Sequence, residues 1–264
     1  MSSQTETSAH LPPLPPEGRW WGTPLRENRW QVELAQLLVE PVFRGNGLPR
    51  GDGRAVVLMP GLGGGDLTLL VLANWLQRLG YRPQVCGFVA NAGCSETAME
   101  QVERQLELLH LWDGRRVALV GHSRGGLYAR ALACRRPELV SHAIALGAGL
   151  RHMLAVSYPT LVFVDRVRRR LLGTGRARSP RCMTAECDCA FTRDMFRPFP
   201  QERVHLTSIY SKGDGVVRWQ AAVVPYGECI EVTGSHTGLI FNREAYRAIA
   251  TALAKPEFPW SQEN

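Results

Sequence analysis

Short apolar runs alternate with stretches of helical periodicity along most of the chain, and this alternation is its dominant pattern. The apolar runs have the length and residue types of strands that are buried on both faces of a sheet. They occupy residues 54–61, 81–88, 115–122, 140–149, 204–211 and 228–234. The helical stretches occupy residues 29–43, 67–80, 96–112, 123–136 and 238–254. Strands that alternate with helices of this length predict an α/β fold, with a mostly parallel sheet flanked by helices.

Two segments depart from this alternation. Residues 1–18 are polar and rich in proline, which is typical of a disordered tail. Residues 150–203 contain an arginine-rich stretch and a cysteine cluster but no clear strand. A chain of 264 residues fits one large α/β domain. We therefore expect a single domain over residues 19–264, with residues 150–203 as a helical insert before the strand at 204–211.

The candidate nucleophile is Ser123, at the centre of the sequence "GHSRG" (121–125). This sequence fits the G-x-S-x-G pattern, and it lies between an apolar strand and a helix, where the pattern marks a nucleophile elbow. A serine on such a sharp turn has strained backbone, so a Cβ atom at Gly121 or Gly125 would collide with the neighbouring chain. The strand-to-helix context argues against a chance match.

A serine hydroxyl needs a base that is itself held by a third group. His236, in "VTGSHTG", lies in a glycine-flanked loop just after a strand, at the sheet edge where active sites gather. We expect it to be the base. Asp214, in "SIYSKGDGVV", lies in a tight loop after the preceding strand and is the candidate acid. His122 precedes the serine and is expected to point away from it. Weaker acid candidates lie in the insert: Asp165, Asp188 and Asp194.

The glycine-rich sequence "MPGLGGGD" (59–66) follows the first predicted strand and lets the backbone approach a substrate closely. We expect the backbone N–H groups of Leu62 and Arg124 to bind the oxyanion that forms during ester hydrolysis. A phosphate-binding loop is the competing interpretation. The sequence lacks the Lys-Ser/Thr ending of a P-loop and the full G-x-G-x-x-G pattern of a dinucleotide site.

Four motifs resemble, in sequence and in order, those of small bacterial lipases and esterases of the α/β-hydrolase superfamily, in particular the compact Bacillus-type (class 2) lipases. They are "VVLMPGLGG", "VALVGHSRGG", "SIYSKGDGVV" and "VTGSHTGLIFNREAYRAI". The resemblance implies an α/β-hydrolase fold and a serine hydrolase of carboxylic esters that uses no cofactor. It implies that Ser123 is the nucleophile, Asp214 the acid and His236 the base. It also implies that Leu62 and Arg124 supply the oxyanion N–H groups.

Two departures from these lipases leave the substrate open. Arg124 stands where such lipases often carry an apolar residue, and the insert at 150–203 is far longer than in the compact type. A small-molecule or lipid ester is the expected substrate. An acyltransferase or thioesterase that uses the same residues is the alternative reaction. A non-catalytic binding scaffold is a third interpretation, which the complete set of candidate residues disfavours.

The formal charge of +7 is concentrated in residues 151–181, which contain eight arginines and one acid, Asp165. A local patch of this kind argues against a nucleic-acid-binding protein. Within it, residues 160–172 place apolar side chains at helical spacing: Leu161, Val164, Val167 and Leu171. The insert is therefore expected to cap the site as a lid, with arginines that contact an anionic membrane surface or an acidic substrate group. The alternative is a solvated helix whose arginines serve only solubility.

Seven cysteines are scattered along the chain. The cluster "CMTAECDC" (182–189) matches no standard zinc pattern, and no second Cys/His pair lies nearby in sequence. We expect free thiols or one local disulfide there, and no bound metal. The N-terminus lacks the pattern of a secretory signal, and no apolar run is long enough to cross a bilayer. On these grounds the sequence predicts a cytoplasmic protein.

Overall fold

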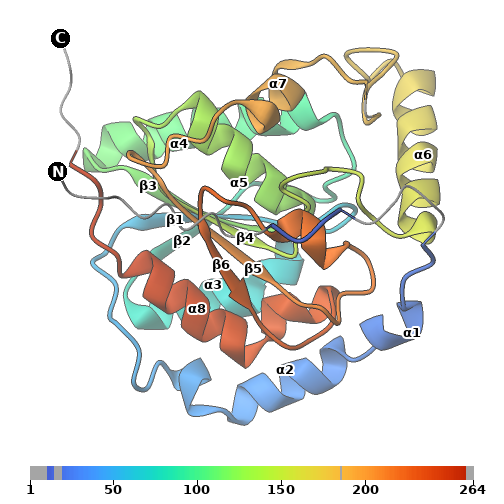
Figure 1. Ribbon diagram of the computed structural model, residues 1–264. Coiled ribbons are helices and arrows are strands. Elements are labelled where there is room, and N and C mark those ends of the chain that lie inside the picture. Colours follow the sequence, from blue (N-terminus) through green and yellow to red (C-terminus); the bar gives the residue numbers. More distant parts are fainter. Residues whose placement is uncertain (1–10, 15–19, 185, 260–264) are drawn as a thin grey trace, which may run out of the picture.

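A parallel six-stranded sheet forms the centre of the molecule (Figure 1). The computed structural model describes residues 11–14, 20–184 and 186–259. The strands are β1 (Ala55–Met59), β2 (Arg82–Val85), β3 (Val117–His122), β4 (Val140–Leu146), β5 (His205–Tyr210) and β6 (Glu228–Glu231). Their order in the sheet is β2-β1-β3-β4-β5-β6, and every neighbouring pair is parallel. The predicted fold class is confirmed.

Helices cover both faces of the sheet, because alternate side chains of each strand point to opposite sides. In β1, Val57 and Met59 belong to one apolar core, and Val56 and Leu58 belong to the other. The first core lies beneath α4 (Ser95–Asp113) and α5 (Arg124–Arg135). The second is covered by α2 (Trp30–Val39), α3 (Leu70–Leu79) and α8 (Arg243–Leu253) (Figure 1). None of the helices in the described residues is long and apolar enough to span a membrane.

The carboxyl ends of β3 to β6 are held in register at one edge of the sheet. Just beyond the strands, the Ser123 N–H donates to the Leu146 carbonyl oxygen at 2.7 Å, and the Gly147 N–H donates to Ile209 at 2.8 Å. Because parallel strands end on the same side, the loops that follow them gather at this edge. The predicted nucleophile, acid and base all lie on these loops.

One predicted helix, at residues 29–43, is too long. In the structure α2 ends at Val39, and Glu40 is extended at φ −75° and ψ 142°. Pro41 is the cause, because the residue before a proline is disfavoured in the helical region. A short 3₁₀ turn, η1 (Pro41–Arg44), follows. The remaining short helical elements are α1 (Pro24–Glu27), η2 (Asp66–Leu69) and η3 (Trp219–Ala222).

The final predicted helix, at residues 238–254, is divided into two elements. They are the 3₁₀ turn η4 (Thr237–Phe241) and helix α8, and Asn242 lies between them. The Asn242 side chain accepts hydrogen bonds from the backbone N–H groups of Glu244 (2.8 Å) and Ala245 (2.9 Å). This is the N-cap arrangement that starts a new helix. The division holds the loop that carries His236 apart from α8.

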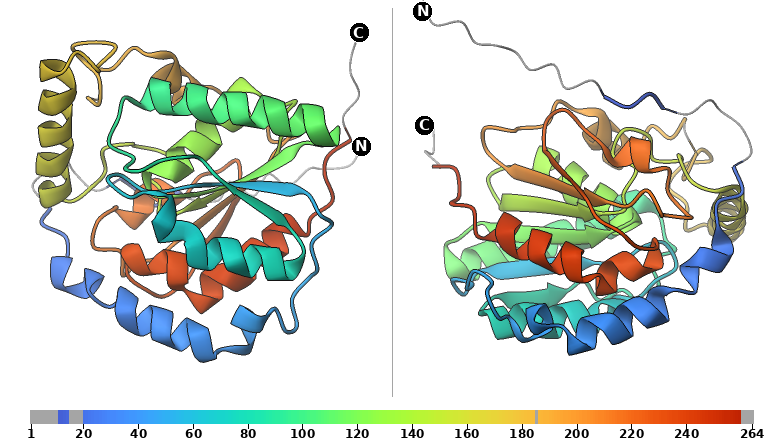
Figure 2. Two further views of the ribbon diagram at one scale, coloured as in Figure 1. Left: turned by 180° about the vertical axis from the view of Figure 1, so that it is seen from behind. Right: turned by 60° about the horizontal axis from the view of Figure 1, so that its bottom comes forward.

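The insert contains two helices with different surroundings, α6 (Tyr158–Gly173) and α7 (Ala190–Phe196). α6 stands at the margin of the molecule, and Leu171 is its one buried residue (Figures 1 and 2). α7 packs against α5 and α4, and its Phe191 ring meets Tyr128 edge-on, with the ring centroids 5.6 Å apart. The second half of the insert is therefore part of the main core.

The predicted tail, residues 1–18, lies outside the described residues except for residues 11–14. Within that short stretch, the Pro12 carbonyl oxygen accepts a hydrogen bond of 2.8 Å from the Arg151 guanidinium. This bond connects the N-terminal stretch to the beginning of the insert.

Replacing Phe191 with alanine should lower the free energy of unfolding by about 3 kcal/mol, because it leaves a cavity in the core. Phe196 provides a matched control on the same helix. It is 58% exposed, whereas Phe191 is 5% exposed, so Phe196→Ala should leave stability nearly unchanged. Urea denaturation of the two variants measures the difference. Equal losses of stability would show that α7 is not anchored in the core.

Candidate active site

Ser123 lies on a strained turn between β3 and α5. Its backbone has φ 52° and ψ −116°, a region that a serine rarely adopts. Its N–H is bonded to Leu146, and its carbonyl oxygen accepts from the Gly126 N–H at 2.9 Å. These bonds fix the turn, so the side chain is projected from the end of the strand toward the cavity that it lines.

Glycines flank Ser123 because neighbouring parts of the chain occupy the space that their Cβ atoms would need. A Cβ atom on Gly121 would overlap the carbonyl group of Gly125, and one on Gly125 would overlap the carbonyl oxygen of Met59. A Cβ atom on Gly126 would come within 2.7 Å of the Cβ of Ala148. The collision predicted from the sequence is therefore present in the structure.

Asp214 and His236 form a buried pair at the ends of β5 and β6. The His236 Nδ1–H donates to Asp214 Oδ2 at 2.7 Å, and both residues are less than a tenth exposed. The other carboxylate oxygen of Asp214 accepts from the N–H groups of Val216 (2.8 Å) and Val217 (2.7 Å). The carboxylate is thus fixed on both oxygens, and it orients the imidazole through Nδ1.

Two opposing effects act on the pKa of His236. Burial alone disfavours the charged imidazolium and lowers the pKa. The charge and hydrogen bond of Asp214, together with the charge of Glu27, outweigh burial, so the pKa of His236 is raised above its usual value.

His122 supports His236, a role that the sequence did not indicate. Its Nε2–H donates to the His236 carbonyl oxygen at 2.9 Å, and the two rings lie 4.8 Å apart between centroids. Burial and the neighbouring His236 lower the pKa of His122 to about 3, so it is neutral near pH 7. Its ring therefore lies against His236.

The structure brings the Ser123 turn and the Asp214–His236 pair together without a hydrogen bond between the Ser123 and His236 side chains. Gly147 lies between them. A Cβ atom on Gly147 would be 3.1 Å from both Asp214 Oδ2 and His236 Nδ1, while the adjacent Leu146 carbonyl holds the Ser123 N–H.

The loop after β1 lies beside Ser123, since a Cβ atom on Gly61 would be 3.2 Å from the Ser123 Cβ. Leu62 and Arg124 both line the cavity into which Ser123 points. Among the described residues, neither backbone N–H donates to a protein acceptor. The N–H groups of the following glycines are occupied instead, with Gly63 bonded to the Asn91 carbonyl at 3.0 Å and Gly64 to that of Gly61 at 3.0 Å. This loop therefore has no free row of N–H groups with which to cradle a phosphate.

Asn91 holds this loop in place, a second supporting role that the sequence did not indicate. Its side-chain amide donates to the Pro60 carbonyl at 2.8 Å, and its backbone N–H donates to Gly64 at 2.7 Å. No local motif marks it, because its partners are about thirty residues earlier in the chain.

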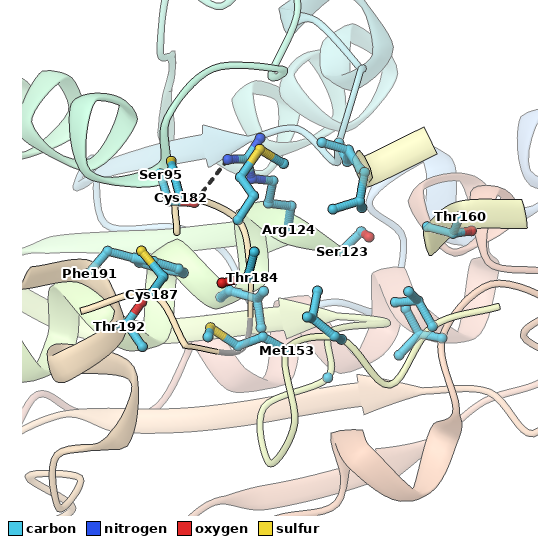
Figure 3. A pocket seen from close by; sticks show the side chains of 18 of the residues that line it. Ser95, Ser123, Arg124, Met153, Thr160, Cys182, Thr184, Cys187, Phe191 and Thr192 are labelled. Carbon is cyan, nitrogen blue, oxygen red and sulfur yellow. Dashed lines mark hydrogen bonds between the residues drawn. The ribbon is translucent and has the colours of Figure 1, made fainter. Parts of the chain in front are cut away.

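A cavity of about 850 Å³, including its open mouth, extends from Ser123 to the insert (Figure 3). Val164 of α6 and Phe191 of α7 both line it, whereas Leu171 is buried but lies outside the lining. α6 also covers the loop after β1, since a Cβ atom on Gly63 would be 3.3 Å from the Phe163 ring. Both halves of the insert thus form walls of the cavity.

No family model and no curated protein sequence matches the chain. Solved structures match it at low identity. A mature-form lipase from Bacillus licheniformis is 14% identical, with 78% of this chain and 94% of that chain covered and a TM-score of 0.54. A monoacylglycerol lipase from Paleococcus ferrophilus is 17% identical, with coverage of 78% and 96% and a TM-score of 0.53. A carboxylesterase from Bacillus subtilis is 11% identical, with coverage of 87% and 99% and a TM-score of 0.51. The chain has the α/β-hydrolase fold.

Within this α/β-hydrolase fold, the Arg124 side chain has a structural role. It is buried, and it donates to the carbonyl oxygens of Asn91 (3.1 Å) and Gly93 (2.7 Å) and to Ser95 Oγ (2.9 Å), the last bond being drawn in Figure 3. It therefore joins the start of α5 to the loop between β2 and α4. This accounts for a charged residue where the resembling lipases often carry an apolar one.

The cysteines near the cavity are thiols. Cys182 and Cys187 are buried in its wall, and Cys187 Sγ lies 3.3 Å from Cys189 Sγ without a disulfide. Within residues 11–14, 20–184 and 186–259, no group of three or more His, Cys, Asp or Glu side chains is arranged to hold a metal ion.

Proposed function

We propose that this α/β-hydrolase cleaves carboxylic esters through a Ser123–His236–Asp214 triad and an acyl-enzyme intermediate. The observation that carries the proposal is the strained Ser123 turn. It opens on a cavity that Leu62 and Arg124 also line, at the same sheet edge as the buried Asp214–His236 pair. The names of the similar lipases and esterase agree with an ester substrate.

In the proposed mechanism, Ser123 Oγ attacks the ester carbonyl while His236 Nε2 takes its proton. Asp214 holds the imidazole in the required tautomer and stabilises the imidazolium. The N–H groups of Leu62 and Arg124 bind the oxyanion of the tetrahedral intermediate. His236 then protonates the leaving alcohol, and water repeats the sequence to release the acid.

The Ser123→Ala variant should lose ester hydrolysis by more than about 10³-fold in kcat, because the nucleophile is removed while packing is undisturbed. A fluorophosphonate probe should label the wild-type protein at Ser123 and leave the variant unlabelled. Hydrolysis of p-nitrophenyl esters by purified protein gives kcat.

Phe196→Ala changes an exposed side chain outside the cavity lining, so it is the control for activity lost during purification. If Ser123→Ala keeps more than about a hundredth of wild-type kcat, the nucleophile is assigned wrongly. Parallel assays with a thioester and with an alcohol acceptor decide between ester hydrolysis and the thioesterase or acyltransferase alternatives.

We further propose that α6 acts as a lid that forms part of an acyl-chain pocket. Val164 lines the cavity, and Phe163 of the same helix touches the loop that carries Leu62. A single buried side chain, Leu171, anchors α6, so its displacement costs less burial than that of α7.

Val164→Trp should narrow this pocket and reduce kcat/KM for p-nitrophenyl octanoate relative to the acetate by about 10-fold, the scale of one or two methylene contacts. Leu172→Trp is the matched control, since Leu172 is exposed on the same helix and lies outside the cavity lining. If both variants keep the wild-type ratio across a chain-length series, α6 does not form the acyl pocket.

The arginine patch at residues 151–181 is proposed to make weak contact with an anionic membrane surface. Several of its charges are already paired: Arg168 and Arg169 with Asp165, Arg178 with Glu100 and Arg181 with Asp188. Arg166, Arg169 and Arg170 are exposed on α6 and remain accessible to a surface.

Changing Arg166, Arg169 and Arg170 together to glutamine should weaken sedimentation with phosphatidylglycerol vesicles at low salt, and the difference should vanish at high salt because of screening. The control replaces three exposed arginines outside the insert, Arg44, Arg50 and Arg104. Equal weakening in both triple variants, or no wild-type sedimentation at low salt, would favour the solvated-helix interpretation.

A further inference from the structure

Residues 20–27 pass between α6 and the loop that carries Asp214. The Trp20 carbonyl accepts from the Tyr158 N–H at 2.7 Å, and the Trp21 and Tyr158 rings lie 5.1 Å apart between centroids. Gly22 has φ +69°, and a Cβ atom there would overlap the carbonyl oxygen of Gly215. α1, at the end of this segment, accordingly lies beside the start of α6 (Figures 1 and 2).

The Glu27 carboxylate at the end of α1 bridges the acid loop and the base loop. Its Oε1 accepts from the N–H of Gly215 at 3.0 Å and from that of His236 at 3.1 Å. Its Oε2 accepts from the N–H of Thr237 at 2.9 Å. Gly215 follows Asp214 directly, so one side chain binds backbone adjacent to the acid and backbone of the base itself.

A second carboxylate, Glu33 of α2, holds the same loop one residue earlier. It accepts from the Ser235 N–H at 2.8 Å and from Ser235 Oγ at 2.7 Å. It approaches so closely that a Cβ atom on Gly238 would overlap it. Among the described residues, neither Glu27 nor Glu33 forms an ion pair, and both carboxylates accept hydrogen bonds from N–H and O–H donors instead.

The charged and titratable groups around His236 come from four elements. Asp214 follows β5, Glu27 ends α1, Glu33 of α2 reaches the loop through Ser235, and His122 of β3 is neutral. The charges of Asp214 and Glu27 both raise the pKa of His236 against the effect of burial. Glu27 therefore acts on the imidazole electrostatically as well as through the backbone.

We propose that Glu27 is a positioning residue for the proposed hydrolase, which holds the acid and base loops together and favours the imidazolium that forms during proton transfer. The proposal rests on the proposed function, because His236 matters only as the base of that reaction. A carboxylate bound solely to backbone could have a structural role alone. A purely structural role would leave the pKa of His236 unchanged when the charge of Glu27 is removed. The proposed role requires that this pKa fall.

Glu27→Gln keeps the size of the side chain but removes its charge and one acceptor. Neutral His236 is the base, so kcat/KM rises with pH through the pKa of the free enzyme. Removing a negative charge lowers that pKa, so the acidic limb of the profile should move to lower pH. We also expect kcat at the pH optimum to fall about 10-fold or more, since a displacement of about 1 Å in a catalytic group can cost about 10².

Two further variants separate charge from fold. Glu40→Gln removes a carboxylate that pairs with Arg243 and Arg247 at the other end of α2, and it should leave both kcat and the limb unchanged. Glu27→Asp keeps the negative charge but shortens the side chain by one methylene, so kcat should fall. The acidic limb of its kcat/KM profile should move less from the wild-type position than that of Glu27→Gln.

An NMR titration of the His236 imidazole, in Ser123→Ala and in Ser123→Ala/Glu27→Gln, measures the same pKa without any substrate. A lower pKa in the double variant supports the proposal, and an unchanged pKa with an unchanged acidic limb overturns it. Absence of fluorophosphonate labelling in the wild type would instead count against the proposed function, while the titration still decides the role of Glu27. If Glu27→Gln does not fold, a wild-type kcat in Glu27→Asp overturns the proposal.

Discussion

The strained backbone of Ser123 is the constraint on which the rest of the site depends. A residue in this region of φ and ψ costs about 1–3 kcal/mol and persists only where its surroundings determine it. Here the surroundings are the Leu146 carbonyl on β4 and the contact of Gly125 with Met59 on β1. Both depend on the parallel register of three neighbouring strands, so the position of Ser123 is set by the centre of the sheet.

Charges in and around the site are satisfied mainly by backbone groups rather than by opposite charges. Asp214 accepts two backbone N–H groups besides His236, Glu27 accepts three, and Arg124 donates to two carbonyl oxygens. A carboxylate bound by backbone N–H groups has no counter-charge beside it, whereas one paired with arginine does. This distinction explains how carboxylates can orient the loops and still favour a positive imidazole.

Much of the fold and the candidate site could be predicted because the signals are local. Strands buried on both faces are continuous apolar runs, and the close passage at Ser123 requires glycines at fixed offsets. Asp214 and His236 could be placed because each follows a strand directly. Pro41 is also a local signal, for the end of a helix, and the helix predicted over residues 29–43 did not take it into account.

The supporting residues could not be predicted in the same way, because their partners are distant in sequence. Glu27 is 209 positions from His236, and no spacing rule connects them. Glu33 is an exception with a local signal, since it lies four positions before the fully buried Leu37 on the inner face of α2. A carboxylate on the apolar face of an amphipathic helix indicates a buried polar contact, but not which loop it binds. α7 could not be predicted from hydrophobic periodicity, because its seven residues are too few to show a helical repeat.

The two ends of residues 20–27 join features that are separate in the sequence. At one end Trp20 and Trp21 contact Tyr158, the first residue of α6, and at the other Glu27 binds the loops of Asp214 and His236. α6 in turn touches the loop after β1 through Phe163 and lines the cavity through Val164. A displacement of the start of α6 must therefore break its contacts with Trp20 and Trp21 or move the segment that ends in Glu27. The wall of the cavity and the backbone around His236 are therefore connected through residues 20–27.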